Sequence, residues 1–80
     1  MPYIPIEDRD KLAHGRIART PGELNYLISQ LIRSYIAMNG LSYTTLNAIA
    51  GVLSCLSMEV YRRITVPYEN QKMAENTDVF

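Results

Sequence analysis

The clearest regular pattern in the sequence is a set of apolar residues that recur every three or four positions after Thr20. The stretch opens with Thr20 as a hydroxyl N-cap, Pro21 at the first helical position and Glu23 three residues after the cap, which is a capping box. The apolar positions that follow share one side of a helix: Leu24, Leu27, Ile28, Leu31, Ile32, Tyr35 and Ile36. Asn39 and Gly40 predict the end of this helix in a left-handed cap.

A second apolar stripe follows a very short turn and predicts a longer helix that opens at Ser42. Its members are Leu46, Ile49, Leu53, Leu56, Val60 and Ile64. Small residues elsewhere on this helix, among them Gly51 and Cys55, predict that it is buried on more than one side and that another backbone approaches closely. Pro67 should end or bend the helix, because its ring meets the carbonyl group four residues earlier. Residues 68–75 should then be helical again.

The N-terminal region has weaker signals. Pro2 and Pro5 favour an extended start, and residues 7–13 predict a short helix that is acidic at its beginning. Gly15 should close this helix, and the last residues, 76–80, form a tail that is either free or docked through Val79 and Phe80. The sequence therefore predicts an all-α fold: a small helical bundle of three to four helices, with a short N-terminal helix, a helical hairpin and a Pro-bent C-terminal helix, in a single domain over residues 1–80.

The size of the chain predicts that it is a homo-oligomer. It has 80 residues, 48% of them hydrophobic, and a core of this size rarely supplies more than ~3–5 kcal/mol of stability. Small domains add disulfides, metals or partner subunits. Cys55 is the single cysteine and His14 the single histidine, so neither an intrachain disulfide nor a Cys-rich zinc site is possible. We expect no metal and no cofactor.

The charge balance argues against a nucleic-acid partner. Eight basic and eight acidic residues give no net charge, whereas duplex binding usually shows a basic excess on one face. The turn over residues 39–42 and the polar start of the next helix resemble a helix-turn-helix, but no lysine or arginine occurs from Ile36 to Val60. An ordinary helical hairpin is the preferred interpretation. No apolar run is long enough for a membrane span and no signal peptide is evident, so we expect a cytoplasmic protein.

Planar and hydrogen-bonding side chains are concentrated between residues 59 and 70. Arg62 and Arg63 offer guanidinium forks suited to a phosphate or carboxylate. Tyr61 and Tyr68 have aromatic faces on which a nucleobase can stack. Further polar groups that could read the edges of such a ligand are Asn25, Tyr26, Glu69 and Asn70. The simpler alternative is that Glu59 pairs with Arg63 on a solvated helix face.

No pattern of catalytic residues accompanies this segment. Ser54 and Ser57 have no recognisable base near them, and His14 lies in the least regular stretch of the sequence. We therefore expect that the protein is not an enzyme.

Five motifs follow one another in an order that is specific. They are Met1-Pro-Tyr-Ile4, Gly22-Glu-Leu-Asn-Tyr26, Tyr61-Arg-Arg63, Pro67-Tyr-Glu69 and Glu75-Asn-Thr-Asp-Val-Phe80. With these motifs the chain resembles a family of short, uncharacterised proteins of bacteriophages and their bacterial hosts. Thr77 and Phe80 stand where that family usually has glycine and tyrosine, and the connector before Thr20 is shorter than usual.

The resemblance implies no activity, but its phage setting suggests uses for a small non-catalytic protein. The first hypothesis is sequestration of a small anionic, nucleotide-like ligand, such as a host defence signal, in a pocket between subunits. The second is a protein–protein interaction module that binds a host protein, since tyrosine and arginine are also common interface anchors. The third is a DNA-binding regulator, which the lack of net charge disfavours. A phage-encoded protein would act in the host cytoplasm.

Overall fold

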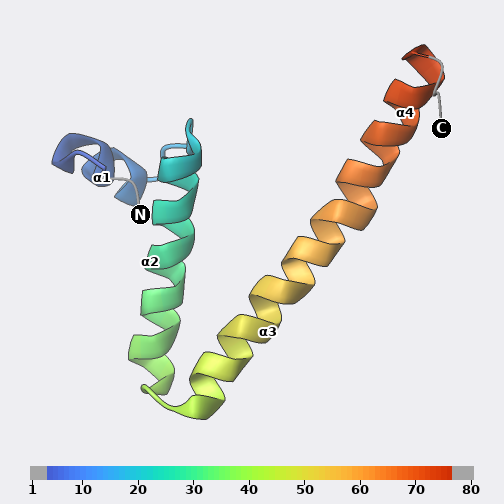
Figure 1. The fold of residues 1–80 in the computed structure, drawn as a ribbon. Helices are drawn as coiled ribbons and strands as arrows, with labels where there is room; N and C mark the ends of the chain where they lie inside the picture. Colours follow the sequence, from blue (N-terminus) through green and yellow to red (C-terminus); the bar gives the residue numbers. More distant parts are fainter. Residues whose placement is uncertain (1–3, 77–80) are drawn as a thin grey trace. The chain divides into compact units, whose positions relative to one another are not determined.

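Helices make up most of residues 4–76, the part of the chain that the computed structural model describes (Figure 1). They are α1 (Ile6–Ala13), α2 (Pro21–Asn39), α3 (Tyr43–Val60), the π-helical segment η1 (Tyr61–Thr65) and α4 (Val66–Asn76). No strand occurs within residues 4–76, and the prediction of an all-α fold with three to four helices is confirmed. Residues 79 and 80, through which the predicted tail was expected to be either free or docked, lie outside the described residues.

The chain divides into two compact units, Met1–Thr45 and Leu46–Phe80. The prediction of a single domain over residues 1–80 and that of a homo-oligomer both stay predictions. None of the helices in residues 4–76 is long and apolar enough to cross a membrane.

The beginning of α2 follows the predicted capping chemistry with one difference. The Thr20 backbone is extended, with φ at −133°, and its hydroxyl accepts a hydrogen bond from the Glu23 backbone N–H at 3.1 Å. The Glu23 carboxylate accepts from the backbone N–H of Arg19 at 2.9 Å, not from that of the N-cap residue. At the other end, Gly40 has a φ of 88° and a ψ of 151°, a conformation that favours glycine. The predicted start and end of this helix are therefore confirmed.

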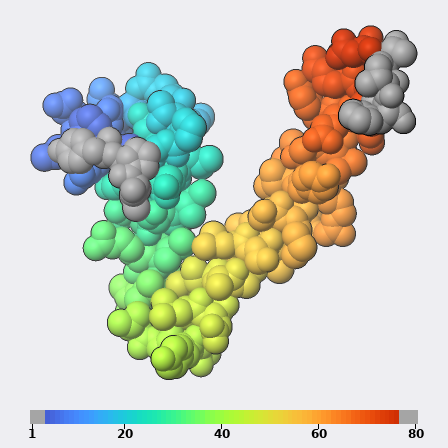
Figure 2. Space-filling view, in the orientation of Figure 1, coloured from blue at the N-terminus to red at the C-terminus, as the bar shows by residue number. Residues whose placement is uncertain are grey.

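An ion-pair network in the first unit joins α1 to the start of α2. Arg16, in the connector, lies 3.1 Å from the Asp8 carboxylate in α1 and 2.6 Å from the Glu23 carboxylate in α2. The Arg16 and Glu23 side chains are only 18% and 12% exposed. Figure 2 shows α1 beside the first turns of α2, where the Arg9 guanidinium also lies 6.0 Å from the centre of the Tyr26 ring. Small as it is, this unit holds the buried apolar side chains Ile4 and Leu12.

The network changes the acid–base properties of its members. The Arg19 backbone N–H is the main cause that lowers the pKa of Glu23, and Arg16 lowers it further, against an opposing effect of burial. Burial lowers the pKa of Arg16, but the Glu23 and Asp8 carboxylates more than offset this and the net effect raises it. The carboxylate and the guanidinium are therefore both held in their charged forms.

The second unit is built on one helix that continues without interruption from α3 through η1 to α4. Among residues 46–76 no side chain is buried. The prediction that this helix is buried on more than one side is thus wrong for the chain as described, and Cys55 is exposed instead of lying in a core. Nothing within 4 Å would meet a Cβ added at Gly51, so the close approach predicted there is not made. The reason is geometric, because a lone helix cannot bury its own surface.

The N-cap prediction can be tested by replacing the Thr20 hydroxyl. Thr20→Ala should lower the free energy of unfolding by about 1 kcal/mol, because the Glu23 N–H loses its hydrogen-bond acceptor. Urea unfolding followed by circular dichroism measures this. Thr20→Ser keeps an oxygen in place and is the matched control. Equal stability of both variants and the wild type would show that the cap contributes nothing.

The Glu23 ion pair predicts a dependence of stability on pH. The pKa of the Glu23 carboxyl is lower in the folded chain than the ordinary value of 4.5, so the charged carboxylate contributes its full stabilisation of the fold above that pH. The contribution is lost as pH falls further, through the folded-state pKa. Glu23→Gln should therefore be less stable than the wild type at pH 7 and should lose less of its stability between pH 6 and pH 3.

Thermal unfolding at several pH values measures this effect. Glu7→Gln, at an exposed position of α1, is the control and should follow the wild-type pH profile. Identical profiles for the Glu23 variant and the wild type would contradict the assignment.

Candidate functional site

Six of the eight predicted site residues lie on η1 and α4. Tyr61, Arg62 and Arg63 are in η1, and the other three are Tyr68, Glu69 and Asn70 in α4. The π-helical turn arises where the Val66 backbone N–H donates to the carbonyl oxygen five residues earlier, at Tyr61. Pro67 follows at once, and its ring would clash with a carbonyl in a regular α-helix. The predicted break at Pro67 therefore takes the form of a widened turn, and the chain stays helical.

Both arginines pair with the same carboxylate. Arg62 Nη2 contacts one oxygen of Glu59, and Arg63 Nε contacts the other. The two arginine side chains are 71% and 79% exposed, so these are surface pairs of modest strength. The structure thus shows the simpler arrangement considered from the sequence, in which Glu59 pairs along the helix. Two guanidinium groups on one carboxylate still leave a positive charge and free N–H groups at this place.

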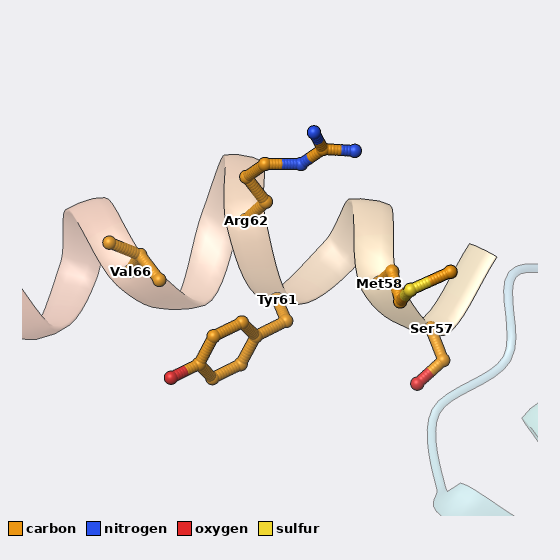
Figure 3. Close-up of a pocket in the computed structure, with 5 residues that line it drawn as sticks. All are labelled: Ser57, Met58, Tyr61, Arg62 and Val66. Carbon is orange, nitrogen blue, oxygen red and sulfur yellow. The ribbon is translucent and has the colours of Figure 1, made fainter. Parts of the chain in front are cut away.

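Two of the predicted residues line a shallow, open depression of about 560 Å³ on the helix surface. Its lining consists of Ser57, Met58, Tyr61, Arg62 and Val66, which we call the Tyr61 patch. Figure 3 shows the Tyr61 ring and the Ser57 hydroxyl on one side of the helix and the Arg62 guanidinium projecting on the other. Because one helix supplies every lining residue, the depression has no facing wall. The arrangement suits a surface contact better than enclosure of a small molecule.

Sequence reasoning missed Met58 and Val66 as members of this surface. Their signal was the spacing of three to four residues that places Met58, Arg62 and Val66 on neighbouring turns. It also missed Arg16, because its partners Asp8 and Glu23 lie eight and seven residues away in the sequence and no helical periodicity links them.

The predicted residues of α4 extend the exposed surface beyond the patch. The Tyr68 side chain is exposed, and the Lys72 ammonium lies 5.6 Å from its ring centre, within the range of a cation–π contact. Lys72 also pairs with Glu75 at 3.3 Å. Glu69 and Asn70 are exposed on the same helix. One face of the Tyr68 ring is therefore already in contact with a cation of its own chain.

The remaining two predicted residues, Asn25 and Tyr26, belong to the first unit. The Asn25 side-chain oxygen accepts a hydrogen bond from the Ser29 hydroxyl at 3.2 Å. Tyr26 is half-buried and has the Arg9 guanidinium over its ring. Because these two residues and the other six lie in different units, their predicted convergence on one ligand stays a prediction.

Comparison with known proteins identifies one family. The model of a family described as a domain of unknown function (DUF6899) matches residues 1–79. No curated protein and no solved structure matches the chain. Within residues 4–76 no three histidine, cysteine, aspartate or glutamate side chains come together as a metal would require.

The link between Pro67 and the π-helical turn can be tested by Pro67→Ala. Alanine restores an N–H and removes the ring, so residues 61–66 should become regular α-helix and the helix should gain up to about 3 kcal/mol. NMR should then show the Val66 N–H bonded to the Arg62 carbonyl in place of that of Tyr61. Val66→Ala keeps the proline and should keep the turn. A π-helical turn that persists without Pro67 would disprove the link.

Proposed function

We propose that this chain, which belongs to the family described as a domain of unknown function (DUF6899), is a non-catalytic protein-interaction module. In the phage setting that the sequence resemblance implies, its partner would be a host protein. The proposal comes from the chain's own residues, because the family description assigns no activity.

The observation that supports it most directly is the composition and exposure of the Tyr61 patch. Tyr61 and Met58 are 58% and 57% exposed and line the same depression as Arg62, whose guanidinium projects on the other side of the helix from the Tyr61 ring. Tyrosine, arginine and methionine are enriched at protein interfaces, and a few such anchors carry most of the binding energy. A shallow apolar surface with one cationic edge fits a protein segment that presents an apolar side chain next to a carboxylate.

Sequestration of a nucleotide-like anion is a second candidate, and one observation favours it. Tyr61 and Arg62 line the same depression, so residues with an aromatic ring and a guanidinium are adjacent there, with the two groups projecting on different sides of the helix. The open geometry requires a second wall, which another subunit would have to supply. A cyclic nucleotide that binds should raise the free energy of unfolding by ~2.7 kcal/mol at a hundredfold excess over its dissociation constant, which a thermal-shift panel detects. DNA binding has the least support, since the chain has no net charge.

The principal proposal is tested by capture of a partner from host lysate and by the effect of Tyr61→Ala. The tagged wild-type chain should retain a stoichiometric protein, and the variant should bind that purified partner about 30-fold more weakly, as loss of a ~2 kcal/mol anchor implies. Titration calorimetry with the purified partner measures the difference.

Tyr43→Ala removes a tyrosine that is 86% exposed and lies at the first residue of α3, outside the Tyr61 patch, so this variant should bind like the wild type. If both variants bind the partner with equal affinity, the Tyr61 patch is not part of the interface. If the chain captured from lysate releases a small molecule and retains no protein, sequestration of a ligand is favoured.

A further inference from the structure

The apolar stripe of α3 is largely exposed and follows a strict heptad spacing. Leu46, Ile49, Leu53, Leu56 and Val60 are separated by three, four, three and four residues. These are a and d positions, which pair helices by knobs-into-holes packing; we call them the heptad face. Leu56 and Val60 are 55% and 50% exposed, and Leu46 and Leu53 are 42% and 41% exposed. An apolar stripe this long, left in water, is a site for another helix.

The π-helical turn extends this face past Val60. A residue in a π-turn advances by less than the 100° of an α-helix, so Ile64 and Tyr68, at steps of four, stay close to the line of the heptad face. Ile64 is 64% exposed and Tyr68 is 59% exposed. The exposed apolar line therefore runs from Leu46 in α3 to Tyr68 in α4.

The length of this line limits which element can cover it. The helix from Tyr43 to Asn76 is roughly 50 Å long at 1.5 Å per residue, whereas the 19 residues of α2 reach only about 28 Å. A hairpin of α2 on α3 would therefore end near Val60. It would leave Ile64 and Tyr68 uncovered. Covering this part therefore takes an element other than α2.

The charges beside the line identify that element. From Tyr43 to Met58 the helix has no charged residue, so a charged partner surface would lose its hydration without gaining an ion pair. Glu59 and Arg63 then follow on one flank of the helix, where they pair with each other. A negative and a positive side chain four residues apart on one flank are self-complementary under a two-fold rotation.

We propose that a second copy of this chain pairs antiparallel with the helix about a two-fold axis near Val60. This arrangement sets Leu56 opposite Ile64 of the second copy and Leu53 close to Tyr68 of the second copy. It also brings each Glu59 within reach of Arg63 of the second copy. A parallel pair would place this charged flank against the uncharged flank that bears Tyr61. Charges beside the seam of paired helices set their orientation in this way.

Charge-exchange variants test both the pairing and its direction. Glu59→Arg leaves only positive side chains at positions 59 and 63, and Arg63→Glu leaves only negative ones, while Arg62 stays unchanged in both variants. Each variant alone should raise the dissociation constant of the self-associated chain about tenfold, because like charges then meet across the axis. An equimolar mixture should return to the wild-type constant, because each positive flank then meets a negative one. Sedimentation equilibrium of the purified full-length chains over a range of concentrations measures all four samples.

A second pair of variants separates pairing from folding. Ile64→Asp places a charge on the shared line and should weaken self-association by about a hundredfold or more, with the helical circular dichroism signal of the monomer retained. Tyr43→Asp, at an exposed position outside the paired segment, should self-associate like the wild type.

A wild-type chain that stays monomeric at 100 µM would overturn the pairing, and a mixture no tighter than its components would overturn the antiparallel direction. These experiments use the purified chain alone, so their outcome is independent of whether the Tyr61 patch binds a partner protein.

Discussion

A single helix cannot bury its own apolar stripe, and this constraint leaves the apolar side chains of the second unit exposed to water. From α3 to α4 the chain places leucine, isoleucine, valine and tyrosine side chains along one line and covers none of residues 46–76 fully. Each such side chain gains roughly 1.5–3 kcal/mol when it is transferred fully from water into a protein interior. A folded domain is stable by only about 5–15 kcal/mol in total, so several uncovered side chains are a large fraction of what is available. This exposure is what supports the proposal that the second unit forms half of an interface.

The first unit buries a few of its apolar side chains within itself. It buries Ile4 and Leu12 and ties α1 to α2 through the ion pairs of Arg16. A partly buried pair of this kind fixes geometry more than it adds stability, because both charges lose hydration. The Glu23 carboxylate combines this role with that of the helix start, since it also accepts a hydrogen bond from the Arg19 backbone. One side chain thus sets the beginning of α2 and the position of the connector.

Local structure could be predicted from the sequence, and the environment of the helices could not. The caps at Thr20 and Gly40 depend on neighbours in sequence, and both occur as expected. The form of the helix at Pro67 was harder to predict, because either a widened turn or a broken helix relieves the clash between the proline ring and the backbone carbonyl. Burial of α3 was predicted wrongly, because periodicity identifies which face seeks a partner but not whether the same chain supplies one. The candidate site shows the same division. The Glu59–Arg63 pair follows from spacing, whereas the link from Arg16 to Asp8 and Glu23 depends on tertiary structure alone.

The central claim is that the apolar line from Leu53 to Tyr68 is covered by another copy of the chain. Hydrogen–deuterium exchange of the backbone amides of residues 53–68, followed as a function of protein concentration, tests it most directly. The account predicts slow exchange at high concentration and a marked acceleration on dilution, while amides at the start of α2 keep their rates. Exchange rates in residues 53–68 that do not change with concentration would contradict it.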